Sequence, residues 1–342
     1  MNTLPNPVPR MTGARTRLSV AALALVLLSG CATLASDGGV ADVQALVGGK
    51  TGSTDARLPT SSGQADAQSV AELLKAPLDA EAAVRIALLN NPGLRGSLAT
   101  LGVSDALRVQ AGTLPNPHFS LGRFRQGDEV EIERFLSFNL IGLLTLPWKY
   151  QWQTRQHELA KLQAAQDVIR LAADTRKAWI TAVAARQSAA YMRDAKEAAE
   201  AGGELARRMA RVGNWSRLRQ AREQLTLAEA TAQLARAEQA AFSARERLTR
   251  LMGLWGAQAD FRLADRLPDL PKDATPMTDI EARALRERLD VRSSMAEARY
   301  VAEQMGFTKV VGYVDGMSIG FARNSVFDND TGTKASNRGV EL

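Results

Sequence analysis

The chain contains very few residues of the kinds that form disulfides or hold metal ions. Among 342 residues there is one cysteine, Cys31, and there are two histidines, His118 and His157. A single cysteine can neither close an internal disulfide nor build a multi-cysteine metal site. The histidines lie outside any cluster with metal-ligand spacing, so we expect both to be solvated surface residues. The sequence therefore predicts no metal site and no cofactor.

Motifs for catalysis and for nucleic-acid binding are also missing. The sequence has no GxSxG, no P-loop and no paired-carboxylate motif. Its 43 Lys and Arg residues exceed its 37 Asp and Glu residues only mildly. The cations are interleaved with acids and form no basic patch with aromatic residues. We therefore expect no catalytic residue and no nucleic acid among the partners.

A short apolar run, LSVAALALVLLS over 18–29, follows a basic start that has no acidic residue. This order is typical of a secretory signal peptide. Twelve helical residues extend only ~18 Å, whereas the hydrocarbon core of a bilayer is ~30 Å thick. The run therefore predicts an export signal over 1–30 and disfavours a spanning anchor.

The residues before the cysteine, Leu28, Ser29 and Gly30, resemble a bacterial lipobox, with Cys31 as the acylated residue. The alternative is a core cysteine beside an ordinary signal. A lipoprotein carries more than one acyl chain, which is the condition for stable membrane attachment. Ala32 follows the cysteine, which favours sorting to the outer membrane. We predict lipidation at Cys31 and outer-membrane lipid as a partner.

The segment over 31–76 is rich in Gly, Ser, Thr, Ala and Asp, which predicts a flexible tether to the lipid. After it, DAEAAVRIALLNNP and PGLRGSLATLGVSDALRVQAG read as two helices, the first capped by Asp79. Pro115 and Pro117 then end the helical pattern. Beyond the signal no apolar stretch is long enough for a spanning helix, so any membrane crossing must use strands or the lipid alone.

Two segments with strand character follow, over 117–126 and 131–144, with a turn at 126–128. In the second, apolar and polar residues alternate, which predicts one apolar and one polar face. Both segments approach the ~9–11 residues of a tilted membrane strand. A hairpin packed on a soluble core fits the pattern equally well. We interpret Glu131 and Glu133 as lumen or loop charges, and Pro147 as the end of the second strand.

Two long helices are predicted next, over about 148–211 and 216–252, separated by a break at Val212, Gly213 and Asn214. The segment 151–211 contains no proline, and as one continuous helix it would extend ~90 Å. The second helix has an apolar seam with heptad spacing. Its members are Leu227, Ala230, Leu234, Ala237, Ala241, Ala244, Leu248 and Leu251. We expect this seam to pack on the preceding helix, although a free-standing coiled coil has the same pattern.

The segment after Pro271 resembles the segment after Asp79, with FSLGRF at 119–124 matched by MSIGFA at 317–322. Such spacing indicates duplication of one large unit. We therefore expect a first repeat over 77–270 and an incomplete second repeat over 271–342. In this reading the second repeat supplies one strand near 316–323 and only the start of another at 339–342.

In order and spacing, the lipobox, NPGLRGSLA, LPNPHFSLG and the helix GNWSRLRQAREQLTLAEATAQLARA resemble the TolC-type outer-membrane efflux proteins. The resemblance implies a mainly α fold with a few strands: a long antiparallel, coiled-coil-like helical hairpin plus strands of a membrane β-barrel. It also implies a homotrimer that contacts a periplasmic membrane-fusion adaptor and an inner-membrane pump. Pro115, Pro117 and Pro147 would mark the junctions between barrel and helices.

By the same resemblance, Val212, Gly213 and Asn214 would form the helical tip that contacts the adaptor. Many members of the family place an aspartate six residues after the glycine, where this chain has Arg219. This difference puts acidic contacts at the tip in doubt.

The functional hypothesis is a passive outer-membrane conduit that exports small molecules such as drugs, metals or other solutes. If the chain ends at Leu342, missing strands and a missing second helical pair would leave the barrel open and the channel impaired or non-functional. The alternative is a lipid-anchored periplasmic coiled-coil protein with a structural or interaction role.

Overall fold

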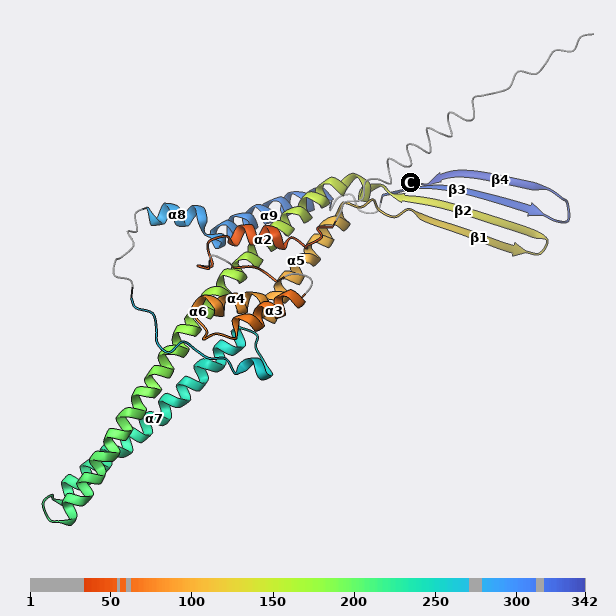
Figure 1. Ribbon diagram of the computed structural model, residues 1–342. Helices are drawn as coiled ribbons and strands as arrows, with labels where there is room; N and C mark the ends of the chain where they lie inside the picture. The colour runs from red at the N-terminus through yellow and green to blue at the C-terminus, as the bar shows by residue number, and fades with distance from the viewer. Residues whose placement is uncertain (1–33, 54–55, 60–62, 271–278, 312–316, 342) are drawn as a thin grey trace, which may run out of the picture. The chain divides into compact units, whose positions relative to one another are not determined.

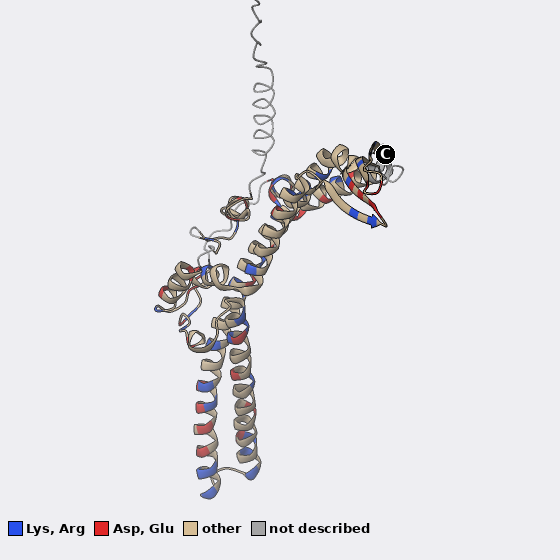
Figure 2. Cartoon of the chain, turned by 90° about the vertical axis from the view of Figure 1, so that its right-hand side faces the viewer, with Lys and Arg blue, Asp and Glu red and all other residues tan. Residues whose placement is uncertain are grey.

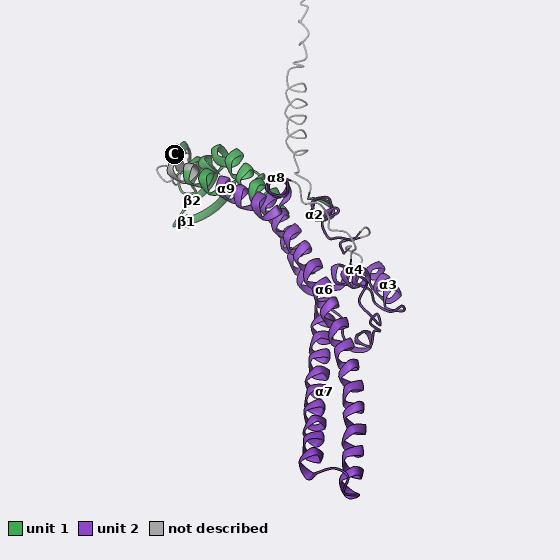
Figure 3. Cartoon of the chain, turned by 90° about the vertical axis from the view of Figure 1, so that its left-hand side faces the viewer, with its two compact units in different colours: residues 1–35, 105–155, 300–342 green, residues 36–104, 156–299 purple. Residues whose placement is uncertain are grey.

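A computed structural model of the chain describes residues 34–53, 56–59, 63–270, 279–311 and 317–341. The proposed lipobox and Cys31 lie outside the described residues. The chain divides into two compact units, coloured separately in Figure 3. The sheet unit comprises 1–35, 105–155 and 300–342, and the helical unit comprises 36–104 and 156–299.

Long helices dominate the described residues, together with one small sheet (Figure 1). The helices are α2 (Val40–Val47), α3 (Gln64–Leu73), α4 (Ala80–Asn90), α5 (Pro92–Ala111), α6 (Leu140–Arg211), α7 (Arg217–Leu251), the 3-10 turn η1 (Gly256–Ala259), α8 (Ile280–Glu287) and α9 (Leu289–Val311). The strands are β1 (His118–Gln126), β2 (Glu129–Asn139), β3 (Ser318–Asp328) and β4 (Lys334–Glu341). Within the described residues, no helix has the length and apolarity that a membrane crossing requires.

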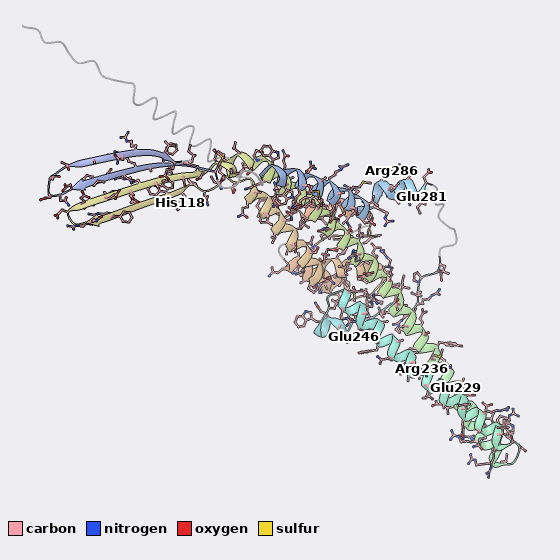
Figure 4. The ribbon with its side chains drawn as sticks, turned by 180° about the vertical axis from the view of Figure 1, so that it is seen from behind. His118, Glu229, Arg236, Glu246, Glu281 and Arg286 are labelled. Atoms are coloured by element: carbon pink, nitrogen blue, oxygen red, sulfur yellow. The ribbon has the colours of Figure 1, made fainter. Side chains whose placement is uncertain are left out.

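The distal parts of α6 and α7 form an antiparallel hairpin (Figure 1). Along α7 the seam positions are the covered ones, from Leu227, which is half-buried, to Leu248, which is fully buried. The opposite side of α7, with Glu229, Arg236 and Glu246, is exposed (Figure 4). An ion pair between Arg193 and Glu238, 2.8 Å from Nη2 to Oε1, also joins the two helices. The predicted packing of the heptad seam on the preceding helix is confirmed.

At its other end, the hairpin is closed by Asn90, the last residue of α4, and by Asn91, which follows it. The side-chain amide of Asn90 donates to the carbonyls of Met252 and Gly253, at 3.2 and 2.8 Å. Asn91 donates in the same way to Leu251, at 2.9 Å. The last carbonyls of a helix have no partner within it, so these amides supply the missing donors at the end of α7.

The core of the helical unit lies around this end. Trp179 of α6 is buried, and its indole N–H donates to the carbonyl of Leu78 at 2.8 Å. Ile86 of α4, Leu248 of α7 and Met252 are buried in the same cluster. These contacts fasten α4 and the base of the hairpin into one body.

The expected flexible tether over 31–76 is wrong for much of its length. Helices α2 and α3 form within it, and Val43, Val47, Leu58 and Val70 are all buried in the helical unit. Val43 and Val47 lie one turn apart and share a helix face, which gives α2 an apolar side. The small and polar residues around them obscured these few apolar anchors.

The four strands form one antiparallel sheet in the order β1-β2-β3-β4. The expectation that the second repeat contributes only one strand and the start of another is wrong. β3 and β4 are paired over eight residues, from Gly320 with Glu341 to Phe327 with Lys334. The order α4-α5-β1-β2 therefore recurs as α8-α9-β3-β4.

The end of β2 also differs from the prediction. The strand ends at Asn139 rather than at 144, and Pro147 lies inside α6. The side-chain oxygen of Asn139 accepts from the N–H of Gly142 at 2.6 Å, as a helix N-cap does. An apolar run as short as 140–146 fits a strand or a helix, and periodicity alone cannot separate them. The cap decides in favour of the helix.

We predict that Leu248→Ala lowers the free energy of unfolding by about 2–5 kcal/mol, because it empties a fully buried site. Leu225→Ala is the matched control, since Leu225 lies on the same helix with 59% of its surface exposed. Its effect should stay within about 0.5 kcal/mol. Urea unfolding followed by circular dichroism measures both. Equal effects of the two substitutions would contradict the assigned seam.

Candidate functional site

The register of the sheet separates its side chains into two chemically different faces, because successive residues of a strand point to opposite sides. One face, here called the apolar-basic face, carries Phe119, Leu121, Arg123, Arg125, Val130, Ile132, Arg134, Leu136, Phe138, Ile319, Phe321, Arg323, Ser325, Phe327, Lys334, Ser336, Arg338 and Val340. The other, the acidic face, carries Glu129, Glu131, Glu133, Asp328 and Glu341 among small and polar residues, together with Phe124, Phe135 and Val326.

Charges of the two signs are completely segregated in the described strands. The apolar-basic face has no Asp or Glu, and the acidic face has no Lys or Arg. On the apolar-basic face, large apolar side chains are open to solvent, with Phe119 and Leu121 63% and 65% exposed. A monomeric soluble protein rarely exposes a contiguous patch of this kind, which points to contact with lipid or with another protein.

On the acidic face, residues of neighbouring strands contact one another. Asn324 donates to Glu131 across the strands at 3.4 Å. Gly320 leaves room for the ring of Phe135, because a Cβ atom at Gly320 would lie 2.6 Å from that ring. Glu131 and Glu133, interpreted from sequence as lumen or loop charges, stand on this face. A polar, negatively charged sheet face is suited to contact with water and cations.

The turn between α6 and α7 contains the residues predicted as the helical tip. Gly213 adopts a left-handed conformation with φ of 80°, which a residue with a side chain rarely takes. The N–H groups of Asn214 and Trp215 donate to the carbonyl of Met209 at 3.0 and 3.2 Å and close the end of α6. Ser216 caps α7 by accepting from the N–H of Arg219 at 3.3 Å.

Arginine is the dominant charge at this turn (Figure 2). Between Glu204 and Glu223 there is no acidic residue, and the cations are Arg207, Arg208, Arg211, Arg217, Arg219 and Arg222. The guanidinium of Arg219 lies over the ring of Trp215, 3.7 Å from its centroid. Val212 and Leu218 are exposed among these charges. The tip thus combines a positive field with apolar contact area.

Glu204 is the one acid paired with this cluster in the described residues. It accepts from Arg208 at 2.8 Å, and this hydrogen bond, aided by the charges of Arg207 and Arg211, lowers the pKa of Glu204. A carboxyl with a lowered folded pKa contributes stability above its unfolded pKa, and that contribution is lost as pH falls through the folded pKa. The pair is exposed, so its effect is small.

The predicted junction prolines have different positions. Pro115 and Pro117 lie in the segment between α5 and β1, as a helix-to-strand break requires. Pro147 lies within α6, eight residues after β2 ends, and so does not mark the junction. At that point the boundary is Asn139, which caps α6.

The two histidines differ from each other. His118 begins β1 and is exposed (Figure 4). The expectation of a solvated His157 is wrong, because it is buried on α6 and its Nδ1 lies 2.8 Å from the hydroxyl of Ser104. In the described ranges no group of three or more His, Cys, Asp or Glu residues is arranged to hold a metal ion.

The sequence matches no protein-family model, and it is similar to no curated protein. Solved structures, in contrast, match over most of the chain. A membrane protein from Pseudomonas aeruginosa gives a TM-score of 0.60 at 17% identity, covering 80% of this chain and 66% of that one. The outer-membrane channel OprN gives 0.57 at 16%, covering 80% and 64%. The CmeC outer membrane channel of Campylobacter jejuni gives 0.56 at 15%, covering 80% and 61%.

The chain has the TolC-type fold. The resemblance inferred from sequence is confirmed at the level of the fold, and the mainly α architecture with a few antiparallel strands fits it. The chain spans less than two thirds of the length of the three structures compared above.

Sequence reasoning missed the segregation of charge between the sheet faces. The alternation of Glu129, Glu131 and Glu133 along β2 was a usable signal for the acidic face. Arg123, Arg125 and Arg134 of the opposite face lie in the same hairpin, whereas Arg323, Lys334 and Arg338 come from strands about 190 residues away in sequence. Only the register of β2 with β3 brings the two groups of cations together.

Proposed function

We propose that the chain is a subunit of an outer-membrane channel, a passive export conduit for small molecules within a tripartite efflux system. The observation that carries this proposal is the sheet with one apolar-basic and one acidic face, built into a TolC-type fold. A membrane barrel needs a sheet with one apolar and one polar face, since lipid contacts one face and water the other. The substrate class is small solutes, with selectivity residing largely in the pump partner.

In this arrangement the apolar-basic face contacts lipid and the acidic face lines the lumen. β1 and β4 are the outer strands of the described sheet, and an outer strand in hydrocarbon leaves backbone groups unpaired at several kcal/mol each. Pairing of these edges with neighbouring copies removes that penalty. The homotrimer implied by the sequence resemblance is one closed solution.

The tip of the α6–α7 hairpin is the proposed contact with the periplasmic membrane-fusion adaptor. Arg217, Arg219 and Arg222 lie at the start of α7, where the helix dipole favours acids rather than cations. The unfavourable placement is offset if an acidic surface of the adaptor packs there, with Val212 and Leu218 as its apolar contacts. At the position where many family members have an aspartate, this chain thus offers Arg219, which would bind an acidic partner surface.

Cys31 is the proposed lipid attachment site, with Leu28, Ser29 and Gly30 as its recognition sequence. Acylation there would fix the chain to the outer membrane independently of the sheet. The alternative of a lipid-anchored coiled-coil protein without a pore explains the hairpin but gives no role to an apolar sheet face.

Channel activity is tested by reconstituting the chain in planar bilayers. We expect discrete conductance steps with a preference for cations over anions, because carboxylates line the lumen face. Replacing Glu131→Gln together with Glu133→Gln should reduce that preference, whereas Glu72→Gln, on α3 outside the sheet, should not. Membrane-inserted protein that never conducts would contradict the channel and favour the coiled-coil alternative.

The tip is tested with Asn214→Cys. If Cys31 is acylated, this is the only free thiol, and a short bifunctional reagent in the periplasm should link it to the adaptor. Added salt should reduce the yield, because it screens the attraction between exposed charges. The Debye length is ~8–10 Å at 0.1–0.15 M ionic strength and becomes shorter as salt is added. Glu229→Cys, farther along α7, is the control and should link poorly. Labelling of position 214 only from outside the cell would show that the orientation is inverted.

The anchor is tested with Cys31→Ser. The variant should accumulate as an unprocessed precursor and lose incorporation of labelled palmitate. Cells that still incorporate the label into the variant would disprove lipidation at this position.

A further inference from the structure

A row of three arginines crosses the apolar-basic face of the sheet. Arg134 of β2 pairs directly with Arg323 of β3, which pairs directly with Arg338 of β4. Directly opposed residues of antiparallel strands have Cβ atoms ~4.5–5.5 Å apart, and like charges at this spacing destabilise the sheet. None of the three makes an ion pair within the described part of the chain. Arg134 donates only to the hydroxyl of Ser325, at 3.5 Å.

The row marks a change along the face, from residues that are all apolar to cations mixed with apolar residues. On the side of the helices, the adjacent register row is Phe119, Leu136, Phe321 and Val340. On the side of the turns the face carries Arg123, Arg125 and Lys334 together with Ile132, Val130 and Phe327. Lys334 lies over the ring of Phe327 at 4.9 Å. Successive residues of a strand rise ~3.3 Å, so the apolar row and the arginine row are separated by ~7 Å. The polarity along the strands is that of one leaflet, from acyl chain to headgroup.

We propose that Arg134, Arg323 and Arg338 bind the phosphate groups of anionic lipids in the membrane around the sheet. The guanidinium fork matches phosphate oxygens with paired hydrogen bonds, and an anion bridging the row removes the repulsion between its members. The adjacent apolar row selects a lipid over free phosphate, since it offers contact to acyl chains. This inference rests on the proposed function, in which the apolar-basic face contacts the bilayer.

The row would also fix the depth of the sheet. Arginine on the lipid-facing side of a barrel is strongly destabilising at the midplane and nearly neutral at the interface. The sheet therefore settles with the arginine row at headgroup level and the row of Phe119, Leu136, Phe321 and Val340 in hydrocarbon.

The test is flotation of the purified full chain with two kinds of vesicle, phosphatidylcholine alone and phosphatidylcholine with phosphatidylglycerol. The anionic vesicles should bind more protein by about tenfold or more at low salt, because each arginine near an anionic surface contributes severalfold. The triple variant Arg134→Gln, Arg323→Gln, Arg338→Gln should lose most of this preference while still floating with both vesicles. The single variant Arg323→Gln should lose a measurable part of the preference for anionic vesicles. Because it is the smaller change, it keeps the test valid if the triple variant misfolds.

The matched control is Arg217→Gln, Arg219→Gln, Arg222→Gln, which removes the same charge from the tip and should keep the preference. A preference that follows the tip arginines instead of the row overturns the proposal. So does binding of inorganic phosphate to the row without any preference for the anionic vesicles, which would identify free phosphate as the ligand. Flotation of the native chain with equal strength on both vesicles overturns the lipid site alone, whereas absence of flotation with either overturns the membrane sheet as well.

Discussion

The pairing of β2 with β3 is the interaction on which the functional surfaces depend. It joins eleven consecutive residue pairs, from Glu129 with Asp328 to Asn139 with Ser318. Each half of the chain supplies a hairpin that alone would expose a free inner edge, and an isolated two-stranded hairpin is marginal in water. Their union creates a surface four strands wide. Both the acidic face and the arginine row exist only because this register aligns them.

The helical hairpin depends instead on a pattern within one helix, the heptad seam of α7. The seam of α7 recurs every seven residues, so the same side of the helix faces α6 along the hairpin. Alanine at four of the eight seam positions keeps the helices close, and Leu248 anchors the base in the core. The charges at the tip add little to this packing. Their role in the proposed function is therefore recognition, although Arg207 and Arg208 also pair with Glu204.

The difference between a long-range strand register and a local heptad pattern explains which elements could be predicted from the sequence. The helical hairpin, its turn at Gly213 and the first strand pair were readable because heptads and alternation are local signals. The fourth strand was missed because KASNRGVE has only one large apolar residue, Val340, and forms a strand through its pairing with β3. At Pro147 the local signal was misleading. Proline is a strong helix breaker, yet α6 begins after the Asn139 cap and continues through Pro147. Helices α2 and α3 depended on a few buried valines that composition alone could not reveal.

The same charge segregation protects the sheet against misregistration. A shift of one residue in a strand moves every side chain to the opposite face. In β2 this would carry Glu129, Glu131 and Glu133 to the apolar-basic face and Arg134 to the acidic one. A carboxylate would then stand against Phe327 in place of Val130. Under the proposed function each misplaced carboxylate would be costly in lipid, so the alternation of acidic and apolar residues along β2 disfavours slipped pairings at the same time as it gives the two sheet faces their opposite chemistry.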